Sequence, residues 1–367
     1  MRLMKVLHIT YDMRIGGTEM VIKNIIEGNS DANIEMSIYC IEAPLGPWGE
    51  DLKASGTPIA VEERQPGFDR SLISKIRKHI KDNDIDILHC HQYTPWVYGA
   101  LAAAFTKTKV IFTEHGRFYP DSSSWKRKFI NPCLLALTSR ITAISQATKL
   151  ALEEFEFIPN EKIEVVYNGI SPIQPELDEV KRIRHALRLK EDTLVFGSIA
   201  RFDPIKNQSM MLAAFAEAEK SLENIHLILV GDGELRDVLE QLAVKLGITE
   251  KVTFTGYIPK PFNYLAAMDV FLLSSLSEGT SMTLLEAMSL GKPCVVTDAG
   301  GNPEIIKHEV NGLVVENDNY TAFAEAMLAL ASKNKHPMRL AAHDRFNNLF
   351  DVSVMSKKYN TIYKTLA

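Results

Sequence analysis

The chain has 367 residues, of which 46% are hydrophobic and 24% are charged, and its formal net charge is −5. This length and composition indicate a globular protein with enough chain for two domains of ordinary size. The negative balance excludes a strongly basic field, so we do not expect nucleic acid as a partner.

The amino-terminal segment predicts a strand rather than a secretory signal, because its apolar run is short and Tyr11-Asp12 stands where a cleavage site would fall. No run approaches the roughly 20 apolar residues of a membrane-spanning helix. Cysteines 40, 90, 133 and 294 show no metal-type spacing and suit a reducing compartment. We therefore expect a cytoplasmic protein.

Short apolar runs alternate with amphipathic segments along the whole chain, the pattern of parallel α/β sheets. A first series of strands is predicted at Lys5–Thr10, Glu35–Ile41, Ile85–Cys90, Val110–Glu114, Arg140–Ile144 and Ile163–Val166. A second is predicted at Leu194–Ala200, Ile225–Val230, Val252–Thr255, Val270–Ser274, Cys294–Thr297 and Gly312–Val315. Two series predict two Rossmann-like domains, joined near residues 168–175, where a glycine and two prolines interrupt regular structure.

Ligands of such sheets bind at the carboxyl ends of the strands, so the strand-end loops are the candidate sites. After the first strand, Gly16 and Gly17 precede Glu19 and a predicted helix, and paired glycines let the backbone approach a ligand closely. The pattern is not Gly-x-Gly-x-x-Gly, which disfavours a nicotinamide dinucleotide. A tight turn without a ligand is the alternative.

Histidines mark the next strand ends. His89 and His91 are two residues apart on a predicted strand, so their side chains lie on the same side and could form a pair of metal ligands. No third ligand is evident nearby, so we expect no metal. His115 and Arg117 follow the next strand, and Ser145 follows the one after. A lone histidine is more often structural than catalytic.

Basic side chains appear at the first strand end of the second series. Arg201 and Lys206 lie five residues apart across a turn and can converge on one diphosphate, the arginine through its fork and the lysine as a point charge. The alternative is a surface loop with scattered charges. Gly231 and Gly233 then follow the next strand as a Gly-x-Gly turn.

The stretch from Ser277 to Met288 carries two carboxylates eight positions apart. Glu278 follows an apolar strand, Thr280 or Ser281 is suited to cap the next helix, and Glu286 falls about two turns along it. Such a helix start attracts phosphate, and flanking carboxylates bind sugar hydroxyls. The alternative is an ordinary capped helix with two solvated glutamates.

These motifs together resemble the GT-B glycosyltransferases, closest to family 4, the retaining "glycosyl transferases group 1" enzymes of bacterial surface polysaccharide and glycolipid synthesis. The resemblance covers nearly the whole chain. It implies two Rossmann-like domains facing across a cleft, with an acceptor domain at residues 1–170 and a donor domain at 171–349. It also implies that the final segment, 350–367, crosses back onto the first domain through a helix at Val352–Leu366.

By this resemblance the catalytic residues would be His115, Arg201, Lys206 and Glu278. The donor site would comprise Gly16, Gly17, Arg201, Lys206, Gly231, Gly233, Tyr257, Ile258, Glu278, Gly279, Thr280, Ser281, Met282, Thr283, Leu284 and Glu286. The acceptor side would include Glu19, His91, Arg117 and Ser145. In these roles Glu278 contacts the sugar, Glu286 the ribose, and the basic pair the β-phosphate.

The function implied is retaining transfer of a sugar, a hexose by family type, from a nucleotide-diphosphate sugar to a glycan or lipid-linked acceptor. Uridine is the family-level expectation for the base. No Asp-x-Asp motif lies in a strand-end loop, so neither a metal nor another cofactor is expected. A non-hydrolysing nucleotide-sugar epimerase and a catalytically silent sugar-nucleotide-binding subunit are the alternatives.

An aromatic-basic segment in the first domain suggests a weak contact with a membrane. Trp125-Lys126-Arg127-Lys128-Phe129 precedes the apolar run 134–137 and could lie on the anionic inner leaflet, which would suit a lipid-linked acceptor. A solvated helix start is the alternative interpretation. The two interpretations place the protein either free in the cytoplasm or attached peripherally to the inner face of the cytoplasmic membrane.

Overall fold

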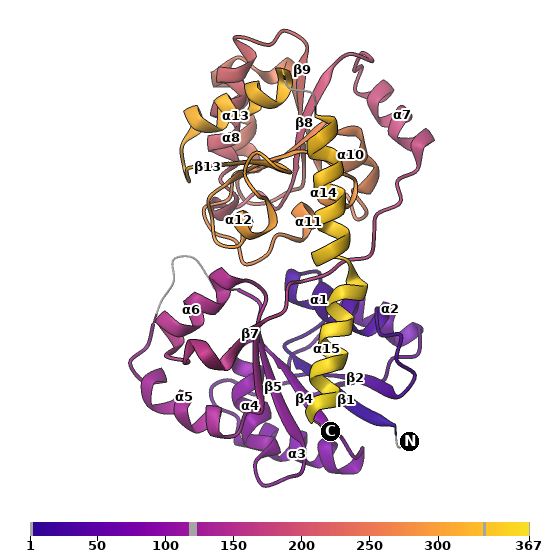
Figure 1. Cartoon of the computed structure of the whole chain (residues 1–367), viewed down its shortest axis with the longest axis vertical. Helices are drawn as coiled ribbons and strands as arrows, with labels where there is room; N and C mark the ends of the chain where they lie inside the picture. The colour runs from indigo at the N-terminus through magenta and orange to yellow at the C-terminus, as the bar shows by residue number, and fades with distance from the viewer. Residues whose placement is uncertain (1–2, 117–122, 333–334, 367) are drawn as a thin grey trace. The chain divides into compact units, whose positions relative to one another are not determined.

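The computed structural model describes residues 3–116, 123–332 and 335–366. The chain divides into two compact units, unit 1 of residues 1–171 with 350–367 and unit 2 of residues 172–349. Figure 1 shows both units as layered α/β structures. No helix within the described ranges is long and apolar enough to cross a bilayer.

Unit 1 contains a seven-stranded sheet in the order β3-β2-β1-β4-β5-β6-β7, with all neighbouring strands parallel. The strands are β1 (Met4–Thr10), β2 (Ile34–Cys40), β3 (Ile59–Val61), β4 (Ile87–His91), β5 (Lys109–Glu114), β6 (Arg140–Ala143) and β7 (Ile163–Val165). The helices are α1 (Gly17–Glu27), α2 (Pro47–Ala54), α3 (Arg70–Asp82), α4 (Tyr93–Ala103), α5 (Arg127–Ala136), α6 (Gln146–Glu156), the 3₁₀ turn η1 (Asn160–Lys162) and α15 (Val352–Leu366).

Unit 2 contains a six-stranded parallel sheet in the order β10-β9-β8-β11-β12-β13. Its strands are β8 (Leu194–Ile199), β9 (Ile225–Val230), β10 (Val252–Gly256), β11 (Val270–Leu273), β12 (Cys294–Thr297) and β13 (Gly312–Val315). Its helices are α7 (Leu177–Ala186), α8 (Gln208–Glu219), α9 (Arg236–Leu246), α10 (Phe262–Ala267), α11 (Met282–Ser289), α12 (Asn302–Ile305), α13 (Tyr320–Ser332) and α14 (His336–Leu349), with 3₁₀ turns η2 (Pro204–Lys206) and η3 (Thr249–Lys251).

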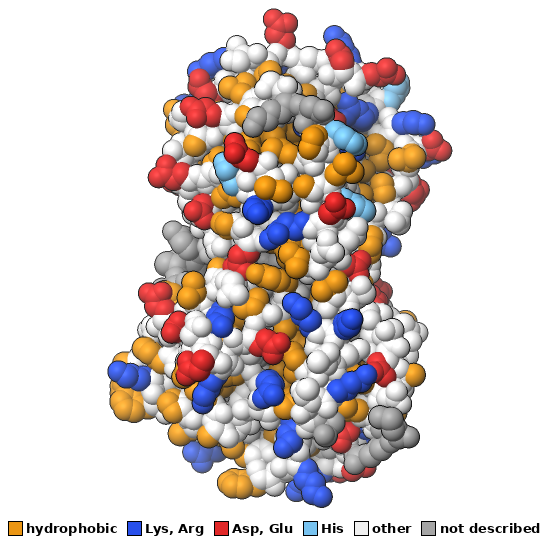
Figure 2. Space-filling model, in the orientation of Figure 1, with side chains coloured by type: hydrophobic (Ala, Val, Ile, Leu, Met, Phe, Trp, Pro, Cys, Tyr) orange, Lys and Arg blue, Asp and Glu red, His pale blue; other side chains and the backbone are white. Residues whose placement is uncertain are grey.

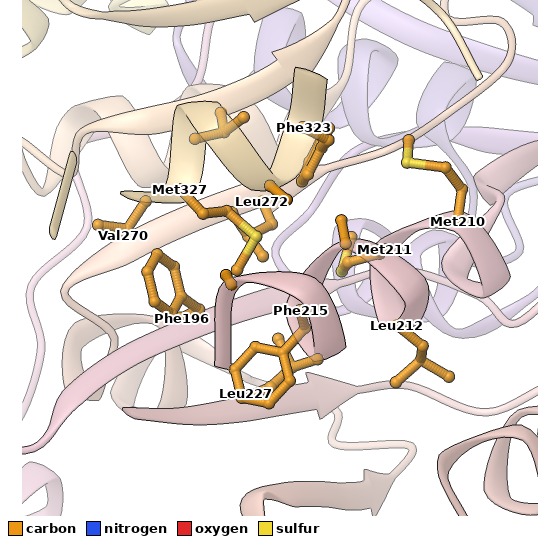
Figure 3. Packing of buried hydrophobic residues seen from close by; sticks show 14 of the residues in the cluster. Phe196, Met210, Met211, Leu212, Phe215, Leu227, Val270, Leu272, Phe323 and Met327 are labelled. Carbon is orange, nitrogen blue, oxygen red and sulfur yellow. The ribbon is translucent and has the colours of Figure 1, made fainter. Parts of the chain in front are cut away.

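The predicted α/β class with two Rossmann-like sheets is confirmed, and every strand predicted from an apolar run is present. The sequence interpretation missed β3, a three-residue edge strand without a buried residue. Its apolar run is only three residues long, which is too short to distinguish a strand from a loop. The core of unit 2 joins β8 and β11 to α8 and α13, and Figure 3 shows Phe196, Phe215, Phe323 and Met327 packed together there.

The two faces of the unit 1 sheet differ in chemistry because strand residues alternate between them. Leu7, Leu88 and Phe112 belong to the apolar core that includes α3 and α4. The intervening residues His8, His89 and Thr113 are completely buried on the opposite side. Figure 1 shows α15 running along this sheet, and the hydroxyl of Tyr363 on α15 lies 2.8 Å from Nδ1 of His89.

Charges of both signs are distributed over the surface. Figure 2 shows lysine and arginine interspersed with aspartate and glutamate on the viewed face of both units, as expected for a chain of small net charge. Several charged side chains form ion pairs one helical turn apart, such as Lys23 with Glu27 and Lys78 with Asp82. Exposed pairs of this kind contribute little to stability.

Candidate functional site

The charged cluster of unit 2 lies where the strand order reverses, between β8 and β11, which is the usual ligand position in open α/β sheets. Lys206 follows β8 and Glu278 follows β11, and Lys206 Nζ lies 2.6 Å from Glu278 Oε1. The Ser275 hydroxyl also donates to Glu278 Oε1, at 2.6 Å. The Glu278 side chain is only 8% exposed, so the carboxylate holds the lysine at a mostly buried point.

Asp203 organises the turn that carries the two basic residues. Its Oδ1 accepts from the backbone N–H of Lys206 at 3.1 Å, and its Oδ2 accepts from Arg201 Nε at 2.8 Å. The Arg201 side chain is 76% exposed, whereas that of Lys206 is 25% exposed. The sequence interpretation missed Asp203, although an Asp-Pro step before a helical turn is a detectable capping signal.

Glycines allow the neighbouring loops to approach this cluster closely. A Cβ at Gly300 (φ +52°) would lie 1.8 Å from the Glu278 carbonyl oxygen, and one at Gly231 (φ +148°) would lie 2.0 Å from the Ala200 carbonyl oxygen. The backbone N–H of Gly301 donates to the same Glu278 oxygen at 3.0 Å. These contacts require glycine because the obstructing atoms belong to the backbone.

Helix α11 carries the second carboxylate. Ser281 caps the helix, accepting from the Leu284 N–H at 3.3 Å. Glu286 is the fifth residue of α11, so it lies about one turn along the helix and not two as the spacing suggested. It is 6% exposed, and Oε2 has no hydrogen-bond partner among the described residues. Burial raises the pKa of Glu286 to about 7.

The interpretation of Glu278 and Glu286 as solvated glutamates is therefore wrong, because both carboxyl groups are buried. A buried carboxyl without a partner is costly unless a ligand supplies hydrogen bonds. Elsewhere in the predicted donor region, Tyr257 is 57% exposed just beyond β10. Gly233 lies against the Phe202 backbone, where a Cβ would come within 2.4 Å of the carbonyl oxygen.

Two histidine candidates of unit 1, His91 at the end of β4 and His115 directly after β5, lie next to the corresponding reversal between β1 and β4. His91 is completely buried beneath His115, with its Nδ1 2.8 Å from His115 Nε2. On its other side, His91 Nε2 lies 2.9 Å from His8 Nδ1. Any part that His91 has in acceptor binding is therefore indirect, through His115.

The structure corrects one step of the metal argument, because a third imidazole does lie beside His89 and His91. The candidate ligand atoms of His8, His89 and His91 all lie within 4.8 Å of one another. Sequence reasoning missed His8 because it lies on β1, more than 80 residues away, where strand pairing aligns it with His89. The sequence did contain one signal for this residue, since His8 interrupts an otherwise apolar run in the predicted first strand.

The remaining acceptor-side candidates have different environments. Glu19 lies in the first turn of α1 beside Gly16, and burial raises the pKa of its carboxyl. Ser145 is buried and caps α6, its hydroxyl accepting from the Thr148 N–H at 3.0 Å, so the structure gives it a structural task. Arg117 lies outside the described residues.

Comparison with known proteins identifies the family. The model described as "Glycosyl transferases group 1" matches residues 179–345, and the model "Glycosyltransferase Family 4" matches residues 15–173. Together these matches span most of both units. The chain is a family 4 glycosyltransferase. The predicted family and enzyme class are thus confirmed.

Individual relatives agree with this assignment. The UDP-Gal:alpha-D-GlcNAc-diphosphoundecaprenol alpha-1,3-galactosyltransferase of Escherichia coli is 25% identical over 98% of this chain and 96% of its own. The N-acetyl-alpha-D-glucosaminyl L-malate synthase of Bacillus anthracis is 28% identical over 81% of this chain and 79% of its own. HepE of Anabaena, solved with UDP, superposes with a TM-score of 0.84 at 22% identity, covering 99% of this chain and all of that one. This family 4 chain accordingly has the GT-B fold.

Proposed function

We propose that this enzyme transfers a sugar from a UDP-sugar to a glycan or lipid-linked acceptor in cell-surface polysaccharide synthesis. The observation that carries the proposal is the Lys206–Glu278 pair at the β8/β11 reversal, within a chain of this family. Relatives support the substrate class, since the E. coli galactosyltransferase is named for UDP-Gal and a diphosphoundecaprenol-linked acceptor, and HepE was solved with UDP-glucose.

The charges of unit 2 suit a departing nucleotide diphosphate. As the bond to the sugar breaks, negative charge grows on the β-phosphate, and a cation already in place stabilises it without reorganisation. Lys206 is held by Glu278 and by the Asp203 turn, while the exposed Arg201 can add a forked contact. With two cations and the positive end of α11, we propose that transfer needs no metal.

The two buried carboxyl groups would bind different parts of the donor. Glu278 accepts hydrogen bonds and can receive hydroxyls of the sugar, whereas the unpartnered Oε2 of Glu286 can receive a ribose hydroxyl. His115, at the end of β5, would lie beside the anomeric carbon. We also propose that the configuration at the anomeric carbon is retained, as the resemblance to family 4 implies.

Calorimetry tests the proposal directly, using UDP, GDP, ADP and their common sugar conjugates with and without EDTA. We expect binding of one uridine nucleotide sugar, unaffected by EDTA and lost in Glu286→Ala. Proton NMR of the first transfer product then gives the anomeric configuration, expected to match that of the donor. Binding without transfer to any lipid-linked acceptor would favour a silent subunit, and epimerised donor would favour the epimerase.

A membrane contact through α5 is a further part of this proposal, since it would bring a lipid-linked acceptor to the enzyme. Trp125 and Phe129 are 71% and 68% exposed and lie one turn apart beside exposed Lys126 and Lys128. Arg127 is not available to this patch, because it pairs with Glu156 at 2.5 Å and covers the Tyr93 ring at 4.8 Å. The patch therefore combines two aromatic rings with two lysines.

Vesicle flotation tests this contact. The doubly substituted Trp125→Ser, Phe129→Ser protein should float less than wild type with anionic vesicles at low salt. Phe105→Ser is the matched control, because Phe105 is fully exposed elsewhere in unit 1. Failure of the wild-type protein to bind such vesicles would end the membrane proposal and leave the transferase proposal intact.

A further inference from the structure

A line of polar side chains crosses one face of the unit 1 sheet. Strand pairing aligns His8 on β1 with His89 on β4, and His91 on β4 with Thr113 on β5. All four residues are completely buried. His115 continues the line two residues after Thr113. Parallel pairing thus brings together four histidines from three separate segments of the sequence.

Three of these histidines form a continuous chain of hydrogen bonds. His8 Nδ1 lies 2.9 Å from His91 Nε2, and His91 Nδ1 lies 2.8 Å from His115 Nε2. Among the described residues, His8 Nε2 and His115 Nδ1 are buried ring nitrogens without a partner. These two nitrogens are the two ends of the chain.

The rings are neutral at physiological pH. Burial lowers the pKa of His8 and of His115 to about 3, and lowers that of His91 well below its usual value. A neutral imidazole has one N–H and one accepting nitrogen. Each contact joins Nδ1 of one ring to Nε2 of the next and needs one donor and one acceptor. The three rings must therefore all carry the proton on Nδ1 or all carry it on Nε2. The rings therefore change tautomer together.

We propose that His8 and His91 are positioning residues for the transfer reaction, which hold the His115 ring and couple its tautomer to their own. Nδ1 of His115 then presents either a donor or an acceptor to the reacting sugar, and the tautomer of the whole chain decides which. The inference rests on the proposed function in placing a sugar at His115.

A metal site on His8, His89 and His91 is the competing explanation, and the hydrogen bonds disfavour it. The facing nitrogens of His8 and His91 already bind each other. Both nitrogens of His89 are also occupied, Nδ1 by the Tyr363 hydroxyl at 2.8 Å and Nε2 by Thr113 Oγ1 at 2.6 Å. A metal ion would have to break these contacts to find three free lone pairs.

Nitrogen NMR of the wild-type protein labelled with ¹⁵N-histidine tests the chain without any substrate. The ¹⁵N shifts of an imidazole distinguish Nδ1–H from Nε2–H, and single substitutions assign the signals. We expect His8, His91 and His115 to be neutral at pH 7 and to share one tautomer. Different tautomers within the three, or a charged ring, would overturn the proposal, as would stoichiometric zinc binding that shifts His8, His89 and His91.

Substitutions test the functional part, with His89 as the matched control. His91→Phe removes both ring-to-ring contacts and should lower kcat about 10- to 100-fold with the donor KM changed less than threefold, while the His115 signals become those of mixed tautomers. His8→Phe, which leaves the His91–His115 contact in place, should lower kcat several-fold. His89→Phe removes an equally buried imidazole from the same strand and should leave kcat within twofold.

Equal losses of kcat in the His89 and His91 variants would show a general packing effect and overturn the assignment. If His91→Phe does not fold, the His8 variant and the wild-type spectra still decide the matter. Absence of transfer by the wild-type enzyme would refute the proposed function, whereas the tautomer measurement would still confirm or refute the chain. The two failures are therefore distinguishable.

Discussion

The strand orders of both units reverse at equivalent places, between β1 and β4 in unit 1 and between β8 and β11 in unit 2. Unit 1 fills this place with neutral histidines, and unit 2 fills it with the charged pair of Lys206 and Glu278. The same position in the strand order therefore carries uncharged side chains in one unit and an ion pair in the other. Paired charges suit a ligand that carries and develops charge, whereas neutral rings suit the orientation of hydroxyl groups.

Burial enforces the difference. The histidines are buried without a carboxylate hydrogen-bonded to their rings among the described residues, so desolvation keeps them uncharged. Lys206 keeps a quarter of its side chain exposed and has a carboxylate at 2.6 Å. The comparison predicts that buried titratable groups of the two units change the free energy of unfolding in opposite directions as the pH falls.

The largest effect that we expect is on the acid stability of unit 1. The folded-state pKa values of His8 and His115 are lowered to about 3, so below pH 6.5 the unfolded chain binds protons that the folded chain does not. These two residues should reduce the free energy of unfolding by about 4 kcal/mol between pH 7 and pH 5. All three tryptophans (48, 96 and 125) lie in unit 1, so urea unfolding followed by tryptophan fluorescence reports this change.

The control for this experiment is His226→Gln, which changes a histidine of unit 2 and should leave the fluorescence transition unaltered at both pH values. A transition midpoint that stays constant from pH 7 to pH 5 in the wild-type protein would contradict the neutral histidine cluster.

Removal of the Lys206 side chain should lower turnover more than it lowers the stability of the protein. Lys206→Ala is expected to lower kcat about 10²- to 10³-fold, because a charge placed for the leaving diphosphate is lost. The Ser275 hydroxyl still donates to Glu278 in this variant, which limits the loss of stability. Lys220→Ala, which removes an exposed lysine paired with Glu217, is the control. Wild-type turnover in a folded Lys206→Ala protein would refute the diphosphate role.

Two glycines of unit 2 with positive φ allow the cost of a steric clash to be distinguished from the cost of the backbone conformation alone. Gly300→Ala should destabilise unit 2 by about 3 kcal/mol and weaken donor binding, because its Cβ meets the Glu278 carbonyl oxygen. Gly247 also has a positive φ, of +74°, but no atom lies within 4 Å of a Cβ there. Gly247→Ala should therefore cost only about 1 kcal/mol. Circular dichroism melts that show equal losses would contradict the close approach at Glu278.

The smallest effect concerns Glu286, whose raised pKa of about 7 has the opposite consequence to that of the histidines. Between pH 4.5 and pH 7 the folded chain holds a proton that the unfolded chain has lost, so this group makes stability fall as pH rises. The gain in the free energy of unfolding from Glu286→Gln should be larger at pH 8 than at pH 5 by about 2–3 kcal/mol. Urea titrations followed by circular dichroism measure this, since unit 2 has no tryptophan.

The same residue links donor binding to protons. A ribose hydroxyl donating to Glu286 would favour its charged form, so nucleotide binding at pH 7 should release protons in wild type and not in Glu286→Gln. Calorimetry in buffers of different ionisation enthalpy measures this release. A buffer-independent binding enthalpy in the wild-type protein would argue against Glu286 as the ribose ligand.

Much of the unit 2 site could be predicted from the sequence, because its parts are short contiguous motifs at strand ends. Arg201 and Lys206 share one loop, and Glu278, Ser281 and Glu286 share another. The burial of both glutamates could not be predicted, since neither the close approach of Gly300 nor the Ser275 contact follows from spacing.

The sequence by itself determined the α/β class, the succession of two parallel sheets and the family, because these depend on apolar periodicity and local motifs. Tertiary structure alone decided the chain from His8 through His91 to His115, since strand pairing joins residues of β1, β4 and the end of β5. It also decided that Tyr363 of the last helix reaches His89, 274 residues away. A hydrogen bond requires that its two groups are close in space. Here the order of the strands in the sheet sets that proximity, and the spacing of residues along the chain does not predict strand order.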